Sequence, residues 1–221
     1  SVVFLKGCNL RCRYCHNPDT WTKEGGEEWE AEGLFQKLYR FKPYWKNKGG
    51  ITVSGGEAML QMEFVTDLFS IAKKHDIHTA LDTSGGPFCM ESDYLESFQK
   101  LMDVTDLFIL DMKEMDPERH KALTGQDNRN ILAFARYLSA HKKTMWIRHV
   151  LVPGLTDSRE SLEALYDFIR ELKSVERVEI LPYHTMGVHK WEALGIPYSL
   201  KNVLPPTEEE VRRAEEILRI K

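Results

Sequence analysis

The segment Gly-Ile-Thr-Val-Ser-Gly-Gly-Glu-Ala-Met-Leu, residues 50–60, contains the pattern that decides the fold. Its apolar run at residues 50–53 is typical of a buried strand and ends in a polar, glycine-rich turn at residues 54–57. Apolar residues then recur at helical spacing, at Leu60, Phe64, Leu68 and Ile71. The segment therefore predicts one βα unit, made of a strand, a polar turn and an amphipathic helix.

Other parts of the chain repeat this unit. Further strands are predicted at residues 2–5, 77–81, 107–110, 144–152 and 177–181. Helical stripes are predicted at residues 131–138 and 162–172, and Thr207 and Glu210 have the capping-box spacing that opens a final helix. Strands that alternate with helices predict a parallel sheet with right-handed crossovers.

Six such units fit into 221 residues, whereas a complete eight-fold barrel needs about 250. We therefore expect an α/β fold, a partial (β/α)6 open barrel, and the pattern leaves an open doubly wound sheet as the alternative. Because no linker or repeat divides the chain, residues 1–221 are expected to form a single domain. The first predicted strand is already under way at Ser1, so we expect an upstream segment to be missing.

Composition excludes several classes of function. The hydrophobic content of 42% suffices for a packed core, and a net charge of −4 offers no basic field for nucleic acid. No run of eighteen apolar residues predicts a membrane span. Four cysteines are too few for a disulfide scaffold, and three of them fall within eight residues, which favours a metal site. Iron–sulfur chemistry at such a site would favour a reducing, cytoplasmic location.

Polar or glycine-rich clusters follow five of the predicted strands. They occupy residues 6–8, 54–57, 82–85, 111–113 and 182–184. The carboxyl ends of parallel strands meet at one edge of a sheet, which is where sites in α/β folds are built. We therefore expect the five clusters to form a single site.

Cys8, Cys12 and Cys15 have the spacing C-x3-C-x2-C. Thiolates are ligands for both zinc and iron–sulfur clusters. A structural zinc ion needs four protein ligands, and only three thiolates are local, whereas a [4Fe-4S] cluster held by three cysteines leaves one iron open to a substrate. The spacing alone leaves zinc open. Cys89 is expected to be a packing residue and otherwise a fourth ligand.

These motifs resemble the radical S-adenosylmethionine (SAM) superfamily. Tyr14 is the aromatic residue before the last cysteine of the signature, and Gly55-Gly56-Glu57 resembles the segment that binds the SAM amino group. The likeness to the family that activates glycyl radical enzymes extends over residues 15–21, 53–58, 81–85, 110–113, 146–148 and 181–184. The chain lacks a cysteine-rich insert after residue 21 and continues through a sixth strand, which favours the pyruvate formate-lyase branch.

The resemblance implies a [4Fe-4S] cluster on Cys8, Cys12 and Cys15, and SAM bound at its open iron. SAM contacts are expected from Tyr14, Cys15, His16, Gly55, Gly56, Glu57, Asp82, Thr83, Asp111, Met112, Lys113 and His184. In this interpretation the Glu57 carboxylate accepts from the SAM ammonium, Lys113 pairs with the SAM carboxylate, and Asp111 bonds the ribose or a cation.

Several of these roles have plain alternatives in the sequence. A solvated turn residue for Glu57, a surface ion pair for Asp111 and Lys113, and an Asx-turn for Asp82 all remain open. Asp82 and Thr83 could instead hold a monovalent cation beside the SAM carboxylate. Arg148 is expected to contact a bound peptide, and the five tryptophans are expected in the core or at interfaces.

The implied reaction is reductive cleavage of SAM to methionine and 5′-deoxyadenosine, which installs a glycyl radical on pyruvate formate-lyase. The implied partners are the glycine loop of that enzyme and reduced flavodoxin or a similar electron donor, with the chain acting as a monomer. Two other classes remain: a radical SAM enzyme acting on a small molecule or on another glycyl radical enzyme, and a non-enzymatic electron-transfer or zinc module.

Overall fold

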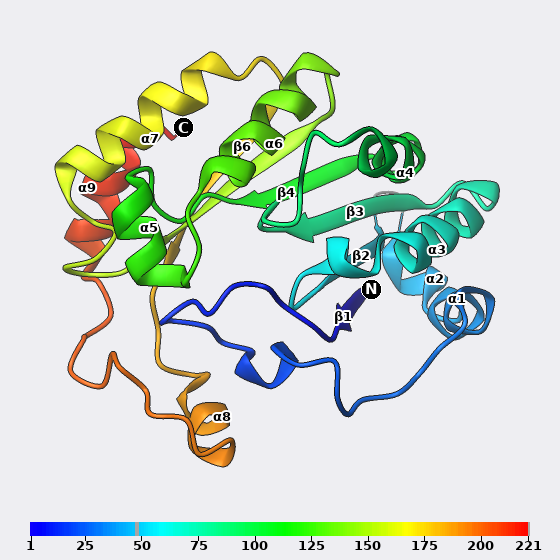
Figure 1. Ribbon diagram of the computed structural model, residues 1–221, viewed down its shortest axis with the longest axis horizontal. Helices are drawn as coiled ribbons and strands as arrows, with labels where there is room; N and C mark the ends of the chain where they lie inside the picture. Colours follow the sequence, from blue (N-terminus) through cyan, green and yellow to red (C-terminus); the bar gives the residue numbers. More distant parts are fainter. Residues whose placement is uncertain (47–48, 221) are drawn as a thin grey trace.

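The computed structural model describes residues 1–46 and 49–220 (Figure 1). Their strands form one sheet in the order β1-β2-β3-β4-β5-β6, and every neighbouring pair is parallel. The strands are β1 (Val2–Leu5), β2 (Gly50–Gly55), β3 (His78–Thr83), β4 (Leu107–Asp111), β5 (Met145–Leu151) and β6 (Val175–Pro182). The predicted strands are thus confirmed.

The order of the strands decides between the two predicted architectures. It follows the chain without a reversal, so the successive crossovers carry the chain in one direction around the sheet. A doubly wound sheet contains a point at which the strand order reverses, and that alternative is therefore wrong. β1 and β6 form the two edges of the sheet. The fold is the partial, open (β/α)6 barrel that the sequence predicts.

The helices are α1 (Ala31–Tyr39), α2 (Lys42–Trp45), α3 (Met62–Lys74), α4 (Ser92–Asp103), α5 (Pro117–Thr124), α6 (Arg129–Ala140), α7 (Arg159–Glu171), α8 (Val188–Ala193) and α9 (Glu208–Leu218), with the 3-10 turns η1 (Pro18–Thr20) and η2 (Ala58–Gln61). Most helices lie along the outer side of the curved sheet, whereas α8 lies apart from them, next to η1 (Figure 1). The predicted stripes belong to α3, α6 and α7. The predicted capping box, Thr207 with Glu210, opens α9.

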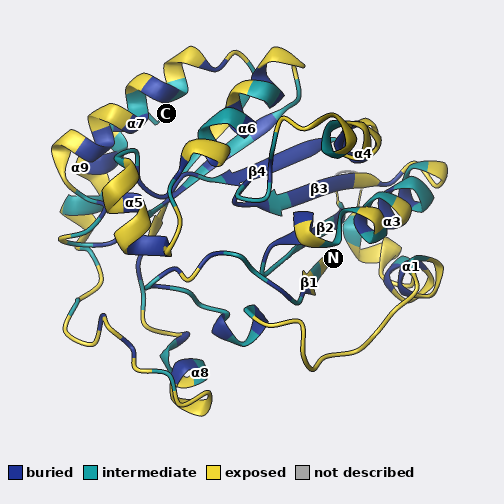
Figure 2. Ribbon diagram, viewed as in Figure 1, coloured by how far each residue is buried: buried dark blue, intermediate teal, exposed yellow. Residues whose placement is uncertain are grey.

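The main core lies between the outer helices and the sheet. Figure 2 shows buried strands beneath helices whose outward faces are exposed. Fully buried aromatic side chains dominate this layer, among them Phe35, Phe69, Phe98, Phe108 and Phe134. Burying a side chain of this kind stabilises the fold by about 1.5–3 kcal/mol. This layer therefore fixes the positions of the strands and of the turns that follow them.

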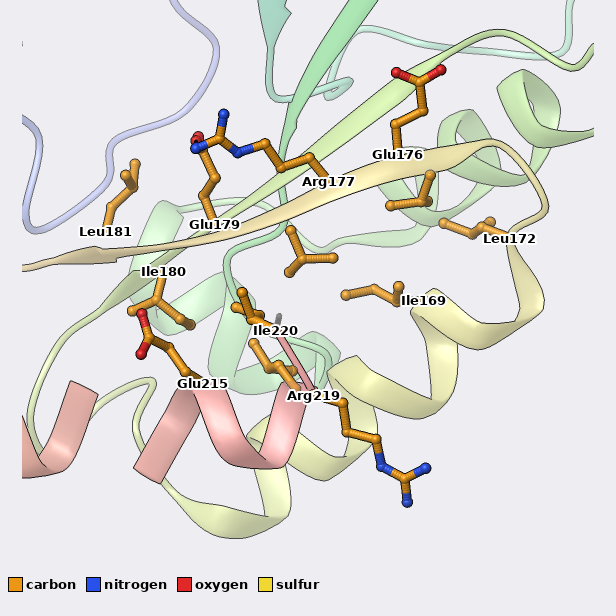
Figure 3. A pocket seen from close by; sticks show the side chains of 13 residues that line it. Ile169, Leu172, Glu176, Arg177, Glu179, Ile180, Leu181, Glu215, Arg219 and Ile220 are labelled. Atoms are coloured by element: carbon orange, nitrogen blue, oxygen red, sulfur yellow. Dashed lines mark ion pairs between the residues drawn. The ribbon is translucent and has the colours of Figure 1, made fainter. Parts of the chain in front are cut away.

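β6 shows how the two faces of the sheet differ in character. Ile180 points toward α9 into a groove between β6 and the outer helices, whereas Arg177 and Glu179 point to the opposite, inner face (Figure 3). Arg177 Nη2 and Glu179 Oε1 form an ion pair of 2.7 Å there. Because side chains alternate along a strand, the outer face packs on helices and the inner face carries charges.

The inner face is apolar at one end and polar at the other. Ala80, Leu107 and Ile109 form a small buried cluster, against which Trp146 packs. Farther along the same strands come Asp82, Asp111 and Arg148, with Asp111 paired with Arg148 in the register of β4 and β5. The apolar layer closes the bottom of the barrel interior, and the polar layer at the carboxyl ends of the strands is left for the site.

Among the described residues, no helix has the length and apolar character needed to cross a bilayer.

Asp106, which precedes β4, connects three elements of the fold. Its carboxylate accepts hydrogen bonds from Lys73 Nζ on α3 at 2.8 Å and from the Thr79 amide of β3 at 2.9 Å. Partial burial acts to raise the pKa of Asp106, but these hydrogen bonds outweigh it and the pKa is lowered. A lowered pKa means that the charged carboxylate stabilises the fold above its unfolded pKa, and that this stabilisation is lost as the pH falls through the folded pKa.

We predict that Asp106→Asn lowers the free energy of unfolding at pH 7 by about 1–2 kcal/mol, because a charge-assisted but partly exposed network is lost. The difference between wild type and variant should be smaller at an acidic pH below the lowered pKa of Asp106, where Asp106 is protonated in the wild type too. Urea denaturation at both pH values measures this. Asp67→Asn, on the exposed face of α3, is the control. An equal loss at both pH values would contradict the prediction.

Candidate active site

A cavity of about 230 Å³ lies at the carboxyl ends of the strands. The predicted site residues line it, apart from Glu57, Met112 and His184. The lining residues among them are Cys8, Cys12, Tyr14, Cys15, His16, Gly55, Gly56, Asp82, Thr83, Asp111 and Lys113. The structure thus brings four of the five predicted clusters together at the carboxyl ends of the strands, whereas no residue of the fifth, residues 182–184, lines the cavity.

The loop that carries the three cysteines is held at each of their backbone carbonyls. The Cys8 carbonyl accepts from Arg11 Nη1 at 2.7 Å, and the Cys12 carbonyl accepts from the Cys15 amide at 3.0 Å. The Cys15 carbonyl accepts from Trp191 Nε1 at 2.8 Å. The backbone around all three thiols is therefore fixed by the chain itself, without help from a ligand.

The thiols fit a cluster better than a single ion. All three are free, and burial, the largest cause, raises the pKa of both Cys8 and Cys12 to about 11. Neutral thiols become ligands only when a metal displaces their protons. In residues 1–46 and 49–220, no three Cys, His, Asp or Glu side chains are placed to hold one metal ion. Three thiols around one cavity suit a larger group, which favours the [4Fe-4S] interpretation over zinc.

Tyr14 adds a second sign that the cavity accommodates a ligand. Its side chain is 6% exposed, and its hydroxyl has no hydrogen-bond partner among the described residues. A buried hydroxyl without a partner costs about 1–3 kcal/mol. Because Tyr14 lines the cavity, a polar ligand would relieve that cost. Cys89 does not line the cavity.

Glu57 lies where the sequence predicts, but its carboxylate does not face the cavity. It is 1% exposed and accepts four hydrogen bonds from the chain. Oε1 accepts from the Met59 amide at 3.0 Å and from the Thr83 hydroxyl at 2.5 Å, and Oε2 accepts from the amide and hydroxyl of Ser84 at 2.9 and 2.5 Å. The geometry therefore makes Glu57 a brace between two turns, with both carboxylate oxygens bonded to the chain.

Gly55 and Gly56 are the residues of this turn that reach the cavity. Gly55 has a φ of +116°, and a Cβ on Gly56 would lie 2.2 Å from the carbonyl oxygen of Gly7. Only glycine fits either requirement. The backbone of β2 can thus lie directly against the start of the cysteine loop.

Lys113 is the buried cation of the cavity. Its side chain is 8% exposed, and Nζ lies 3.1 Å from Asp111 Oδ2 and 5.8 Å from the Tyr14 ring centroid. Burial acts to lower the pKa of Lys113, but the Asp111 carboxylate outweighs it and the pKa is raised. The ammonium stays charged at neutral pH, so it can attract a ligand carboxylate.

Asp82 is the second carboxylate of the polar layer. It accepts from the Ser54 hydroxyl at 2.7 Å and lies 3.8 Å from Arg148 Nη1. Burial, followed by repulsion from Asp111, raises the pKa of Asp82 to about 6. Two neighbouring carboxylates that resist ionisation together favour a bound cation or a hydrogen-bond donor. Arg148, which the sequence predicts to contact a bound peptide, also forms an ion pair with Glu179 of β6 at 3.0 Å. This ion pair holds the Arg148 side chain against the inner face of the sheet.

The segment after β6 folds back over the cysteine loop. The His184 and His16 rings stack with centroids 4.0 Å apart, and His16 Nε2 lies 3.1 Å from the His184 carbonyl. His184 therefore does not line the cavity itself; it packs against His16, which does. Met112 is 2% exposed, and its carbonyl accepts from His149 Nδ1 at 2.8 Å. The Met112 amide also donates to the Arg148 carbonyl at 2.8 Å, so both backbone groups of Met112 are bonded within the chain.

Sequence reasoning did not identify Ser54, Ser84 or Trp191 as parts of the site. Ser54 and Ser84 lie inside clusters that the sequence had singled out, so their position at strand ends was a usable signal. Trp191 lies 176 residues from the carbonyl that it holds, and no local pattern indicates that contact.

We predict that Glu57→Gln lowers the free energy of unfolding of the metal-free protein by about 2–3 kcal/mol. The amide would place a donor against the donors of Ser84 or of Thr83 and Met59. Chemical denaturation measures the loss. Glu63→Gln, on the exposed face of α3, should change stability little. Equal stabilities of the two variants would show that the brace is unimportant.

Comparison with known proteins identifies the family. The profile of the radical SAM superfamily matches residues 2–169. Pyruvate formate-lyase-activating enzyme of Streptococcus mutans is 55% identical over 219 residues, which cover 98% of this chain and 83% of that protein. The Listeria monocytogenes enzyme of the same name is 45% identical, with 98% and 88% covered.

A solved structure supports the fold. Streptococcus suis SuiB bound to S-adenosylmethionine has a TM-score of 0.71 at 16% identity, and the match covers 99% of this chain and 46% of that one. At this identity the likeness concerns the fold alone, and it agrees with the partial barrel described above. Together with the superfamily match and the high-identity relatives, these comparisons show that the chain belongs to the radical SAM superfamily and, within it, to the pyruvate formate-lyase-activating enzymes.

Proposed function

We propose that this chain activates pyruvate formate-lyase by installing a radical on a glycine of that enzyme. The observation that carries the proposal is one cavity that combines three free thiols on a fixed loop, a glycine-rich strand end and a buried, charged lysine. The 55% identity to the Streptococcus mutans activating enzyme supports the choice of partner. We further propose that residues 1–221 act as one domain and as a monomer in the cytoplasm.

The bound [4Fe-4S] cluster and SAM supply the reductive cleavage of SAM to methionine and 5′-deoxyadenosine, coupled to removal of one hydrogen atom from the partner's glycine. Cys8, Cys12 and Cys15 would hold the cluster. Lys113 would pair with the SAM carboxylate. The ammonium would be held by backbone carbonyls near Gly55 and Gly56, because the Glu57 carboxylate is already saturated.

The remaining predicted contacts have supporting roles. Asp82 and Asp111 would share a monovalent cation or the ribose hydroxyls, since their proximity disfavours two unscreened charges. Tyr14 and His16 would contact the adenine, with His184 stacked behind His16. These side chains orient SAM and keep water away from it.

The partner's glycine would enter from the open side of the barrel. Val2 and Phe4 of β1 are 55% and 59% exposed, and Leu181 of β6 is 36% exposed. Val2 and Phe4 alternate with Val3 and Leu5, which pack on the outer core, so they face the interior. These apolar edges border an entrance through which an extended loop could reach the cavity. The electron would come from reduced flavodoxin or a similar one-electron donor.

We predict that anaerobic reconstitution loads about four irons per chain. Cys8→Ala, Cys12→Ala and Cys15→Ala should each abolish the visible absorption of the cluster, because each removes a ligand. Cys89→Ser is the matched control and should keep it, since Cys89 lies outside the cavity. Iron analysis and absorption spectra decide the point. Stoichiometric zinc without iron, or loss of the cluster in Cys89→Ser, would refute the assignment.

We predict that a peptide copying the glycine loop of pyruvate formate-lyase accelerates SAM cleavage by the reduced, cluster-loaded chain. Deuterium at its glycine Cα should appear in the 5′-deoxyadenosine, because the hydrogen is transferred directly. Mass spectrometry follows the label. The Streptococcus mutans relative serves as the positive control, and Cys12→Ala as the negative one. Cleavage that leaves the deuterium in the peptide would favour a small-molecule substrate instead.

A further inference from the structure

The loop between Cys8 and Cys12 carries an exposed arginine on its outer side. Arg11 Nη1 donates to the carbonyls of Cys8 and Leu10 at 2.7 and 2.8 Å, and its guanidinium lies 5.1 Å from the Trp21 ring centroid. Three contacts thus hold the cation in one place, directly over the backbone of a proposed cluster ligand. The thiols themselves face the cavity on the inner side of the loop.

The chain contacts of the cysteine loop bring three more basic residues to the same region. The amides of Arg11 and Arg13 donate to the carbonyls of Thr124 and Leu123, at the end of α5 that carries exposed Lys121. Arg13 Nε bonds Ser199 Oγ at 3.1 Å, and exposed Lys201 lies two residues farther along. We call this surface the basic face, and it consists of Arg11, Arg13, Lys121 and Lys201.

The charges of the basic face are not neutralised locally. Within the described part of the chain, none of its four residues forms an ion pair with a carboxylate. The five glutamates of residues 24–32 belong to a separate segment that leads into α1. The face is thus a local positive patch on a chain whose net charge is −4.

We propose that the basic face is the docking surface for an acidic one-electron carrier protein. The proposal rests on the proposed function, whose reaction consumes one electron for each SAM cleaved. SAM and the glycine loop occupy the cavity side of the cysteine loop. The outer side of the loop is therefore the short remaining path by which an electron can reach the cluster. The docked carrier is oxidised by one electron and the cluster is reduced by one. Positive charges around the route would steer the carrier and align it.

Binding of an oxidised, acidic flavodoxin tests the surface directly. Lys121→Gln/Lys201→Gln removes two charges without touching the Arg11 contact to Cys8. At low salt the dissociation constant should rise about three- to tenfold, and at high salt the difference should vanish. Lys74→Gln/Lys100→Gln removes two exposed charges from α3 and α4 and should leave binding unchanged. Calorimetry on folded, cluster-loaded protein measures all three forms.

Reduction kinetics separate docking from chemistry. In the Lys121→Gln/Lys201→Gln variant, cluster reduction by flavodoxin hydroquinone should slow, while reduction by photogenerated deazaflavin, a small chemical reductant, should not. Equal effects of the two double variants, or unchanged binding in the first, overturn the docking face. If the wild-type protein, reduced by deazaflavin, forms no glycyl radical on pyruvate formate-lyase, the proposed function is contradicted. That outcome is measured by detecting the glycyl radical, and not by carrier binding or cluster reduction.

Discussion

The buried carboxylate of Glu57 joins the turns that follow β2 and β3, and the shape of the cavity depends on this contact. Its four hydrogen bonds reach Met59, Thr83 and Ser84. The Glu57 amide also donates to the Gly7 carbonyl at 2.8 Å, one residue before Cys8. One residue therefore fixes the exits of three neighbouring strands. A buried charge is tolerated here because it is fully hydrogen-bonded.

Charged side chains of opposite sign lie next to one another inside the barrel. Lys113 faces Asp111, and Arg148 bridges Asp82 and Glu179. A ligand with one carboxylate and one ammonium group can enter without adding net charge to this set. The pattern fits the amino-acid end of SAM, and it explains why so polar a cavity can exist beside an apolar layer.

Much of the fold could be predicted from the sequence because its signals are local. The apolar runs define the strands, and the Thr207–Glu210 pair is a complete capping box. Even the less amphipathic α5 has a local start signal, the N-cap Asp116 followed by Pro117. The role of Glu57 could not be predicted, because spacing shows that a carboxylate follows a strand but not where it points. The contacts of Trp191 and His184 with the cysteine loop join residues 168 or more apart, beyond any local pattern.

Leaving the barrel open has a physical reason in this family. A closed barrel would pair β6 with β1 and remove both edges, but it would also leave only the end of the barrel as an entrance. In the route proposed above, the exposed Val2 and Phe4 border a side entrance, while the cysteine loop and the segment around Trp191 lie at the end of the barrel. A glycine embedded in another protein can reach the cavity only on an extended loop, and a side entrance accommodates the chain on both sides of that glycine. The same arrangement leaves the outer surface of the cysteine loop free, so that the protein substrate and an electron carrier need not compete for one opening.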